Sequence, residues 1–423
     1  AIAGPLFSFN GAMLLSPILA AWFTFLLCRR ITGSFSASLI GGWLFGFSPY
    51  LLSQLTSHLN LALVFPLPAI VLLVLRALDG DEGRARFVLL LALLLALQLG
   101  FSLEVFATFS LFGALALLVA YALADAPVRA GLRSWLPWLV LGYLVALAIA
   151  SPYLYYALKP GGLPVLTWRT DKFSADLLAY VIPNTYTQLG GSSFPSLTAR
   201  FTAYAVEGSA YLGIPLLAMM LLGTVTGWRR RGVRVMALIT VVVFVCSLGG
   251  RLNVAGPTGV PLPWAAVHKL PALGLLLPAR MVVYVFLIGS LLSALWLAAD
   301  HRRWRWALPA AAIVFLWPAI GGNYWRSIPE QPAFFRAGAY RTAIRPRDTV
   351  LVLPVGIAGQ SMLWHAEAHL GFTMASGYVT APEAPDPYQR FAVYPMLVYL
   401  AQVPHAAAAA ATFLHAEHIT VVV

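Results

Sequence analysis

The chain has 423 residues, of which 60% are apolar and 10% are charged, and its mean hydropathy of +0.82 excludes an ordinary soluble domain. We therefore treat the lipid bilayer as the solvent of the fold. The net charge of +12 does not indicate nucleic-acid binding, because all basic residues except Lys159, Lys172 and Lys269 are arginines that lie in short segments between apolar runs.

The two ends of the sequence indicate a piece of a longer protein. The chain opens at Ala1 without an initiator Met or the basic stretch and cleavage site of a signal peptide, and it stops in a β-branched run at Val423. We expect the chain to begin partway through the protein and leave the completeness of its C-terminus open. Cys28 and Cys246 fall on opposite predicted membrane faces, which excludes a disulfide between them and a cysteine metal site.

Ten apolar runs are long enough to cross about 30 Å of hydrocarbon at about 1.5 Å per residue. The apolar stretch from Phe87 to Ala124 is too long for one crossing, and Gln98 to Glu104 marks its hairpin tip. The predicted spans lie near residues 11–28, 36–54, 60–78, 86–101, 104–124, 135–157, 208–226, 233–250, 280–299 and 305–323.

The distribution of arginine predicts the orientation. Fourteen arginines between Arg29 and Arg305 fall on one side of the predicted helices, whereas the short connections on the other side, near residues 1–10, 55–59 and 102–103, hold none. The positive-inside rule makes the arginine-rich side cytoplasmic. The loops 158–207 and 251–279 and the tail from about 324 are then extracytoplasmic.

Two domains are predicted. Residues 1–323 form an all-α polytopic membrane domain. Residues 324–423 form a small extracytoplasmic α/β domain, because Asp348–Pro354 and His418–Val423 are short β-branched runs separated by alanine-rich sequence.

Several short motifs resemble the bacterial GT-C superfamily of integral-membrane glycosyltransferases. They are Cys28–Ser34, Phe45–Tyr50, Ser57–Leu61, Phe173–Leu178 with Ile182–Pro183, Glu207–Gly213, Leu277–Arg280, Val350–Gly356 and Ser361–Trp364 through Gly377–Tyr378. The resemblance implies a GT-C-like fold and transfer of a sugar from a polyprenyl-phosphate donor to an acceptor at the outer face. The superfamily's best-established catalytic carboxylate lies between its first two helices, and we expect this chain to begin after it.

Three carboxylates are candidates for acid or base chemistry: Glu104, Glu207 and Asp176. Glu104 lies at the predicted outer hairpin tip, where an ionisable group beside hydrocarbon costs free energy unless it is paired or hydrated. Glu207 precedes a predicted span and is expected to face the same cavity as Glu104. The alternative for each is a structural carboxylate, and for Asp176 it is an acid favoured by the start of a helix.

Six residues are candidates for substrate binding: His58, Asn60, Tyr211, Arg251, Lys269 and Arg280. His58 and Asn60 lie in a predicted outer turn and could bind sugar or phosphate, or cap the following helix. The cations Arg251, Lys269 and Arg280 could grip a lipid-linked phosphate or anchor to lipid headgroups.

The sequence predicts no metal site. His365 and His369 have zinc-compatible spacing on a helix, but no third ligand follows, so surface histidines are the alternative. The sequence does not identify a cofactor. A divalent cation, Mg²⁺ or Mn²⁺, is the candidate.

The first hypothesis is the glycosyltransferase, with membrane lipids and a lipid-linked sugar as partners. A non-catalytic scaffold or accessory subunit of a larger membrane complex is the alternative, so whether the chain is an enzyme stays open. A secondary transporter would require inverted repeats and charges at the membrane midplane, which the sequence does not have.

Overall fold

A computed structural model describes residues 4–159, 172–270, 273–300, 302–319, 332–355, 359–375 and 387–423. The chain divides into two compact units. One comprises residues 11–153 and 169–324, and the other comprises residues 1–10, 154–168 and 325–423.

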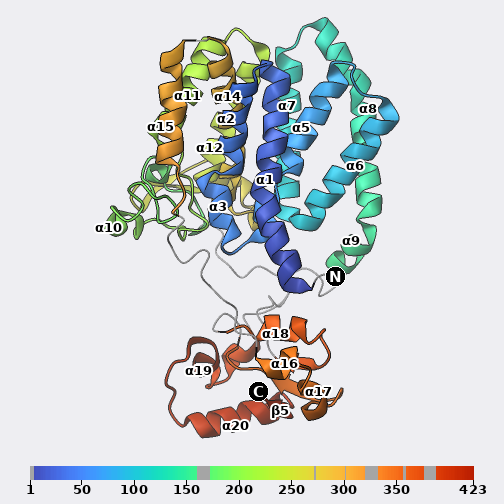
Figure 1. Cartoon of the computed structure of the whole chain (residues 1–423), viewed down its shortest axis with the longest axis vertical. Helices are drawn as coiled ribbons and strands as arrows, with labels where there is room; N and C mark the ends of the chain where they lie inside the picture. Colours follow the sequence, from blue (N-terminus) through green and yellow to red (C-terminus); the bar gives the residue numbers. More distant parts are fainter. Residues whose placement is uncertain are drawn as a thin grey trace. The chain divides into compact units, whose positions relative to one another are not determined.

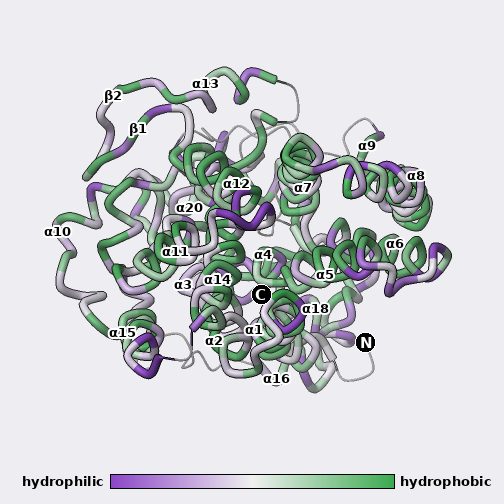
Figure 2. The backbone as a smooth tube through the Cα atoms, turned by 90° about the horizontal axis from the view of Figure 1, so that it is seen from above, coloured by the Kyte–Doolittle hydropathy of each residue, from purple (hydrophilic) through white to green (hydrophobic). Residues whose placement is uncertain are grey.

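The larger unit is a bundle of apolar helices that run roughly side by side (Figure 1). Hydrophobic residues dominate the helices, and hydrophilic residues gather in several of the connecting segments (Figure 2). The elements up to residue 319 are α1 (Pro5–Thr32), α2 (Phe35–Gly46), α3 (Pro49–Leu55), α4 (Leu59–Ala62), α5 (Pro66–Leu78), α6 (Arg84–Phe101), α7 (Leu103–Leu123), α8 (Ala126–Ile149), α9 (Ser151–Leu158), η2 (Leu177–Tyr180), α10 (Pro195–Thr198), α11 (Gly213–Gly227), α12 (Arg231–Ser247), β1 (Arg251–Asn253), β2 (Pro257–Pro261), α13 (Trp264–Val267), η3 (Leu273–Leu275), η4 (Pro278–Met281), α14 (Val282–Ala298), η5 (Arg303–Trp306) and α15 (Ala307–Phe315).

The chain is a helical polytopic membrane protein, but the described residues contain fewer full-length spans than the ten predicted. Six segments are long and apolar enough to cross a bilayer, and the bent pair α2 and α3 would make a seventh. The six segments are Phe7–Thr32, Leu59–Leu78, Arg84–Phe101, Leu103–Leu123, Ala126–Ile149 and Pro278–Ala298.

The shortfall has local backbone causes. The predicted span 36–54 is broken at Phe47 and Ser48, where α2 and α3 meet at 42° and Pro49 begins the second helix. The predicted span 305–323 gives the nine-residue helix α15, because Pro318 disfavours helical backbone at the residue before it. Residues 320–323 of that prediction lie outside the described residues.

The predicted spans 208–226 and 233–250 give the 15-residue helix α11 and the 17-residue helix α12. At about 1.5 Å per residue these helices are shorter than the roughly 20 residues that a full crossing requires. Both predictions were based on apolar content alone. In the structure α11 begins only at Gly213, whose backbone is left-handed at φ +70°.

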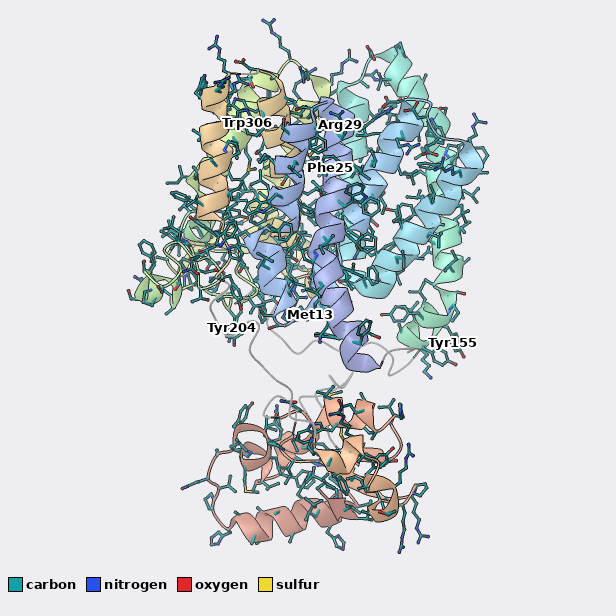
Figure 3. All side chains as sticks on the ribbon, in the orientation of Figure 1. Met13, Phe25, Arg29, Tyr155, Tyr204 and Trp306 are labelled. Atoms are coloured by element: carbon teal, nitrogen blue, oxygen red, sulfur yellow. The ribbon has the colours of Figure 1, made fainter. Side chains whose placement is uncertain are left out.

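The two ends of the larger unit differ in charge. Arg29 and Trp306 lie toward one end, and Met13 and Tyr204 lie toward the other (Figure 3). The first end carries Arg29 and Arg30 at the end of α1 and the arginines between α11 and α12. We call it the basic end.

Close packing holds the centre of this unit. Within the segment Pro278–Ala298, 83% of the most apolar window is buried, and its helix α14 packs against α2, α11 and α12. Gly223 of α11 lies against α14 so closely that an added Cβ would meet the carbonyl oxygen of Leu292 at 2.4 Å. Small residues therefore let these backbones approach, as in other membrane helix pairs.

The smaller unit contains a three-stranded parallel sheet in the order β4, β3, β5. Val350 on one face of β3 packs with Phe335 and Trp364, and Leu351 on the other face packs with Val393 and Phe413. The strands β3 and β5 form within the two runs that the sequence predicted as strands, and helices pack against both faces. The elements after residue 331 are α16 (Ala333–Arg336), α17 (Tyr340–Ala343), β3 (Thr349–Leu351), α18 (Ser361–Glu367), β4 (Thr373–Ala375), η8 (Pro387–Arg390), α19 (Tyr394–Tyr399), α20 (Ala406–Ala416) and β5 (Val421–Val422).

Candidate functional site

Arg280 of η4 joins two carboxylates from distant parts of the chain. Its Nε donates to Oε2 of Glu207 at 2.9 Å and its Nη2 donates to Oε1 of Glu207 at 2.5 Å, while Nη1 donates to Oε2 of Glu104. The side chains of Glu104 and Arg280 are each 18% exposed, and that of Glu207 is 5% exposed. The sequence analysis expected Glu104 and Glu207 to face one cavity and considered Arg280 separately. The structure brings all three together as a carboxylate–arginine cluster.

Hydrogen bonds between α7 and α14 hold the cluster in place. The backbone N–H of Leu277 donates to Oε1 of Glu104 at 2.8 Å. One turn further into the bundle, the Thr108 and Tyr284 hydroxyls lie 2.6 Å apart, and the Tyr284 hydroxyl donates to the Val105 carbonyl at 3.1 Å. These bonds fix the start of α7 beside the start of α14, which places Glu104 and Arg280 in contact.

Hydrogen bonds from α3 to the neighbouring residue Val206 fix the position of Glu207. The carbonyl of its neighbour Val206 accepts from Oγ of Ser53 at 3.1 Å and from Nε2 of Gln54 at 3.2 Å. Nδ1 of His58, which lies at the start of α4, is 3.1 Å from Oε1 of Gln54 and 3.6 Å from Oε1 of Glu207. His58 therefore joins the edge of the cluster.

The cluster carries a formal charge of −1 when both carboxylates are ionised, since two carboxylates face one guanidinium. Buried charges of this kind are stable only when they are paired and hydrogen-bonded. Three of the five N–H groups of Arg280 point at carboxylate oxygens. Three N–H groups of the guanidinium thus bind the two acids, and the role of Arg280 as a phosphate clamp stays a prediction.

The Tyr50 hydroxyl lies beside the cluster and was not nominated from the sequence. Tyr50 is fully buried and interacts electrostatically with Arg280, Glu207 and Glu104, yet its hydroxyl has no hydrogen-bond partner among the described residues. A buried polar group usually finds a partner, so the unpaired hydroxyl of Tyr50 departs from this rule. Its position after Pro49, at the start of a helix, gave no signal that it would face charged residues.

Asp176 takes no part in the cluster. Its carboxylate is 2% exposed and accepts from three backbone amides, those of Leu178 at 2.9 Å, Ala255 at 3.1 Å and Gly256 at 2.9 Å. The carboxylate thereby ties the start of η2 to the turn between β1 and β2. These bonds are typical of a structural carboxylate. The sequence analysis gave this role as the alternative for Asp176, because the residue lies at the start of a helix.

The other nominated residues lie apart from the cluster's contacts. Asn60, Arg251 and Lys269 are exposed, and their side chains form no ion pair or hydrogen bond with the described residues. Tyr211 is buried in the core of the larger unit. His58 occupies the N-cap position of α4 but makes no capping hydrogen bond through its side chain.

The described residues contain no group of three His, Cys, Asp or Glu side chains that could hold a metal ion. Nε2 of His365 donates to the Phe372 carbonyl at 2.9 Å, and helix α18 ends before His369, whose φ is +53°. The two imidazoles therefore do not share a helical face. The carboxylates of the cluster are paired with Arg280.

An apolar cavity of about 360 Å³ lies in the same unit, between η2, α11, α12 and α14. Leu178, Leu217, Phe244 and Val285 are among its lining residues, and none of the cluster's charged residues lines it. Its lining is suited to a hydrocarbon chain.

Residues 5–318 match the model of a family described as a domain of unknown function, DUF6311. The chain belongs to this family. The match covers the helices from α1 to α15, including Glu104, Glu207 and Arg280, and ends before the three-stranded sheet of the smaller unit. No curated protein and no solved structure matches the chain.

Proposed function

We propose that this DUF6311 protein is an integral-membrane glycosyltransferase that moves a sugar from a polyprenyl-phosphate donor to an acceptor at the outer face of a bacterial inner membrane. The GT-C-like arrangement expected from the sequence motifs supports the proposal. The observation that carries it is the carboxylate–arginine cluster with His58 and Tyr50, which gathers acidic, basic and hydroxyl groups from four separate segments at one end of membrane helices.

The cluster lies at the end of the bundle that is opposite the arginine-rich connections. The positive-inside rule would place that end outside the cytoplasm, where lipid-linked sugar donors are consumed in this proposal. The apolar cavity between α11, α12 and α14 would accept part of a lipid chain. No step of the proposal uses a divalent cation.

The roles of the charged residues follow from their contacts. Glu104 and Glu207 keep negative charge where an oxocarbenium-like sugar would develop positive charge, and Arg280 fixes their positions.

Transfer of label from polyprenyl-phosphate sugars by the full chain in lipid vesicles tests the proposal. We expect transfer by the wild type and a loss of at least about 100-fold in Glu207→Gln. The matched control is Glu82→Gln: Glu82 is also a buried glutamate, 2.9 Å from Nε of Arg76, but it lies in the connection between α5 and α6 at the basic end. Absence of transfer from every donor, with a known transferase active in the same vesicles, would overturn the proposal.

A non-catalytic membrane scaffold is the second candidate, and one observation favours it. Each oxygen of Glu207 accepts from Arg280, and each oxygen of Glu104 accepts from Arg280 or Leu277, so the cluster is also complete as a structural ion network. In a scaffold, Glu207→Gln would lower stability or partner binding, and no transfer would be measured for any variant.

A further inference from the structure

The two ring nitrogens of His58 have different surroundings. Nδ1 lies 3.1 Å from Oε1 of Gln54 and 3.6 Å from Oε1 of Glu207. The amide of Gln54 is oriented by its Nε2, which donates to the Val206 carbonyl, so the Gln54 oxygen faces the imidazole. Both neighbours of Nδ1 are therefore acceptors, and Nδ1 must carry the proton.

Nε2 of His58 is consequently unprotonated in the neutral ring. It makes no hydrogen bond with the described residues, and the side chain is 37% exposed. Burial lowers the pKa of His58, Arg280 lowers it further and Glu207 opposes both. The ring is thus neutral near pH 7, and the negative charge of Glu207 stabilises the imidazolium that forms when Nε2 takes up a proton.

The oxygens of the cluster's carboxylates are already engaged, unlike this nitrogen. All four accept from Arg280 or from the backbone of Leu277. A general base must lie within hydrogen-bond reach of the proton that it takes, and the accessible Nε2 meets this condition better than the engaged oxygens.

We propose that Nε2 of His58 is the general base of the transfer and that Glu207 is its positioning residue; this inference rests on the proposed function. Nε2 takes the proton of the acceptor hydroxyl. The oxygen's electron pair forms the bond to the anomeric carbon, while the bond from that carbon to the donor's phosphate oxygen breaks and its electron pair leaves with the lipid phosphate. The proton on Nε2 then passes to water or to the released phosphate.

Two substitutions separate a base from a structural residue. The amide nitrogen of His58→Asn can replace Nδ1 as a donor to Gln54 and Glu207, but this variant has no group in place of Nε2 as a base. We expect His58→Asn to melt near the wild-type temperature and to lose at least about 100-fold in transfer rate. Added imidazole should restore part of this activity. His58→Gln, which carries its amide near the Nε2 position, should be equally inactive.

The pH dependence of the transfer rate also distinguishes a base from a structural residue, because a purely structural role of His58 would not shift it. The wild-type rate should fall at acid pH as His58 becomes protonated, and Glu207→Gln should move this fall to lower pH, because Glu207 raises the pKa of His58. His58→Asn within a few-fold of the wild type, or an acid limb unchanged in Glu207→Gln, would overturn the assignment while leaving the proposed function standing.

A chemical measurement is independent of activity. Diethyl pyrocarbonate reacts with unprotonated imidazole nitrogens, and we expect it to modify His58 at Nε2 in the folded protein, with the exposed His405 as the internal reference. Modification of His405 without His58 would show that Nε2 is not free and would overturn the inference. Absence of transfer by the wild type from every donor would overturn the proposed function and the role of His58 with it, whatever the modification shows.

Discussion

Arg280 and Glu207 are 73 residues apart in the chain and meet through two parallel N–H···O bonds, from Nε to Oε2 and from Nη2 to Oε1. This two-point contact fixes the plane of the carboxylate as well as its distance, which a single bond from a lysine would not do. The same guanidinium also holds Glu104, so one side chain links the starts of α7 and α14 to the segment before α11.

Replacing Arg280 by Met should destabilise the protein strongly. The substitution leaves two buried carboxylates without their partner, which costs about 3–5 kcal/mol when one member of a buried pair is removed. Thermal unfolding in detergent micelles measures the effect. Arg251→Met is the control, because Arg251 is exposed and forms no ion pair with the described residues. Equal melting of Arg280→Met and the wild type would contradict the buried network.

His58 should make the stability depend on pH on the acid side. Burial lowers its pKa in the folded protein, so below the ordinary value of about 6.5 the unfolded chain binds a proton that the folded protein does not yet accept. Stability therefore falls as the pH drops from about 6.5 toward the lower folded-state pKa. Melting temperatures at pH 7.5 to 5 should decline less in His58→Asn than in the wild type, and parallel declines would count against this effect.

Asp176→Asn should loosen the hairpin of β1 and β2. An amide keeps one acceptor oxygen but turns an N–H group toward backbone amides that the carboxylate now satisfies, a change worth about 1–3 kcal/mol. Limited proteolysis near Gly256 should become faster. The control is Asp300→Asn, because Asp300 is a loop carboxylate more exposed than Asp176. This variant should leave the rate of proteolysis near Gly256 unchanged.

Gly223→Ala should separate α11 from α14. The added methyl group would lie 2.4 Å from the Leu292 carbonyl oxygen, so the backbones must move apart at a cost of about 1–3 kcal/mol. Gly113→Ala is the matched control, because Gly113 is also inside a membrane helix and an added Cβ there meets nothing within 4 Å. Similar melting temperatures for the two variants would show that α11 and α14 do not pack this closely.

The orientation in the membrane is testable with single cysteines. Lys269→Cys should react with an impermeant maleimide in intact cells, whereas Arg229→Cys should react only after the membrane is opened. Cys28→Ser and Cys246→Ser provide the background without native thiols. Labelling of Arg229→Cys alone in intact cells would reverse the predicted topology, and with it the side on which the cluster lies.

Much of the architecture could be read from local sequence. Long apolar runs bounded by arginines predicted helices α1, α5, α6, α7, α8 and α14, because in hydrocarbon each backbone polar group must be satisfied within its own segment. The breaks were missed where one residue changes the backbone, as at Pro49 and Pro318, since hydropathy over a window of residues is insensitive to a single position.

The candidate site was likewise only partly predictable from the sequence. The sequence by itself singled out Glu104, because an ionisable residue beside hydrocarbon is costly, and it singled out Glu207, Arg280 and His58 by their places in outer turns or at the ends of predicted spans. Only the tertiary structure decided that Arg280 pairs with both acids. It also decided that the Asp176 carboxylate accepts from backbone amides and that Tyr50 interacts electrostatically with the charged cluster. The physical reason is that a charged side chain's role depends on which partners it meets, and here those partners lie 73 and 176 residues away along the chain.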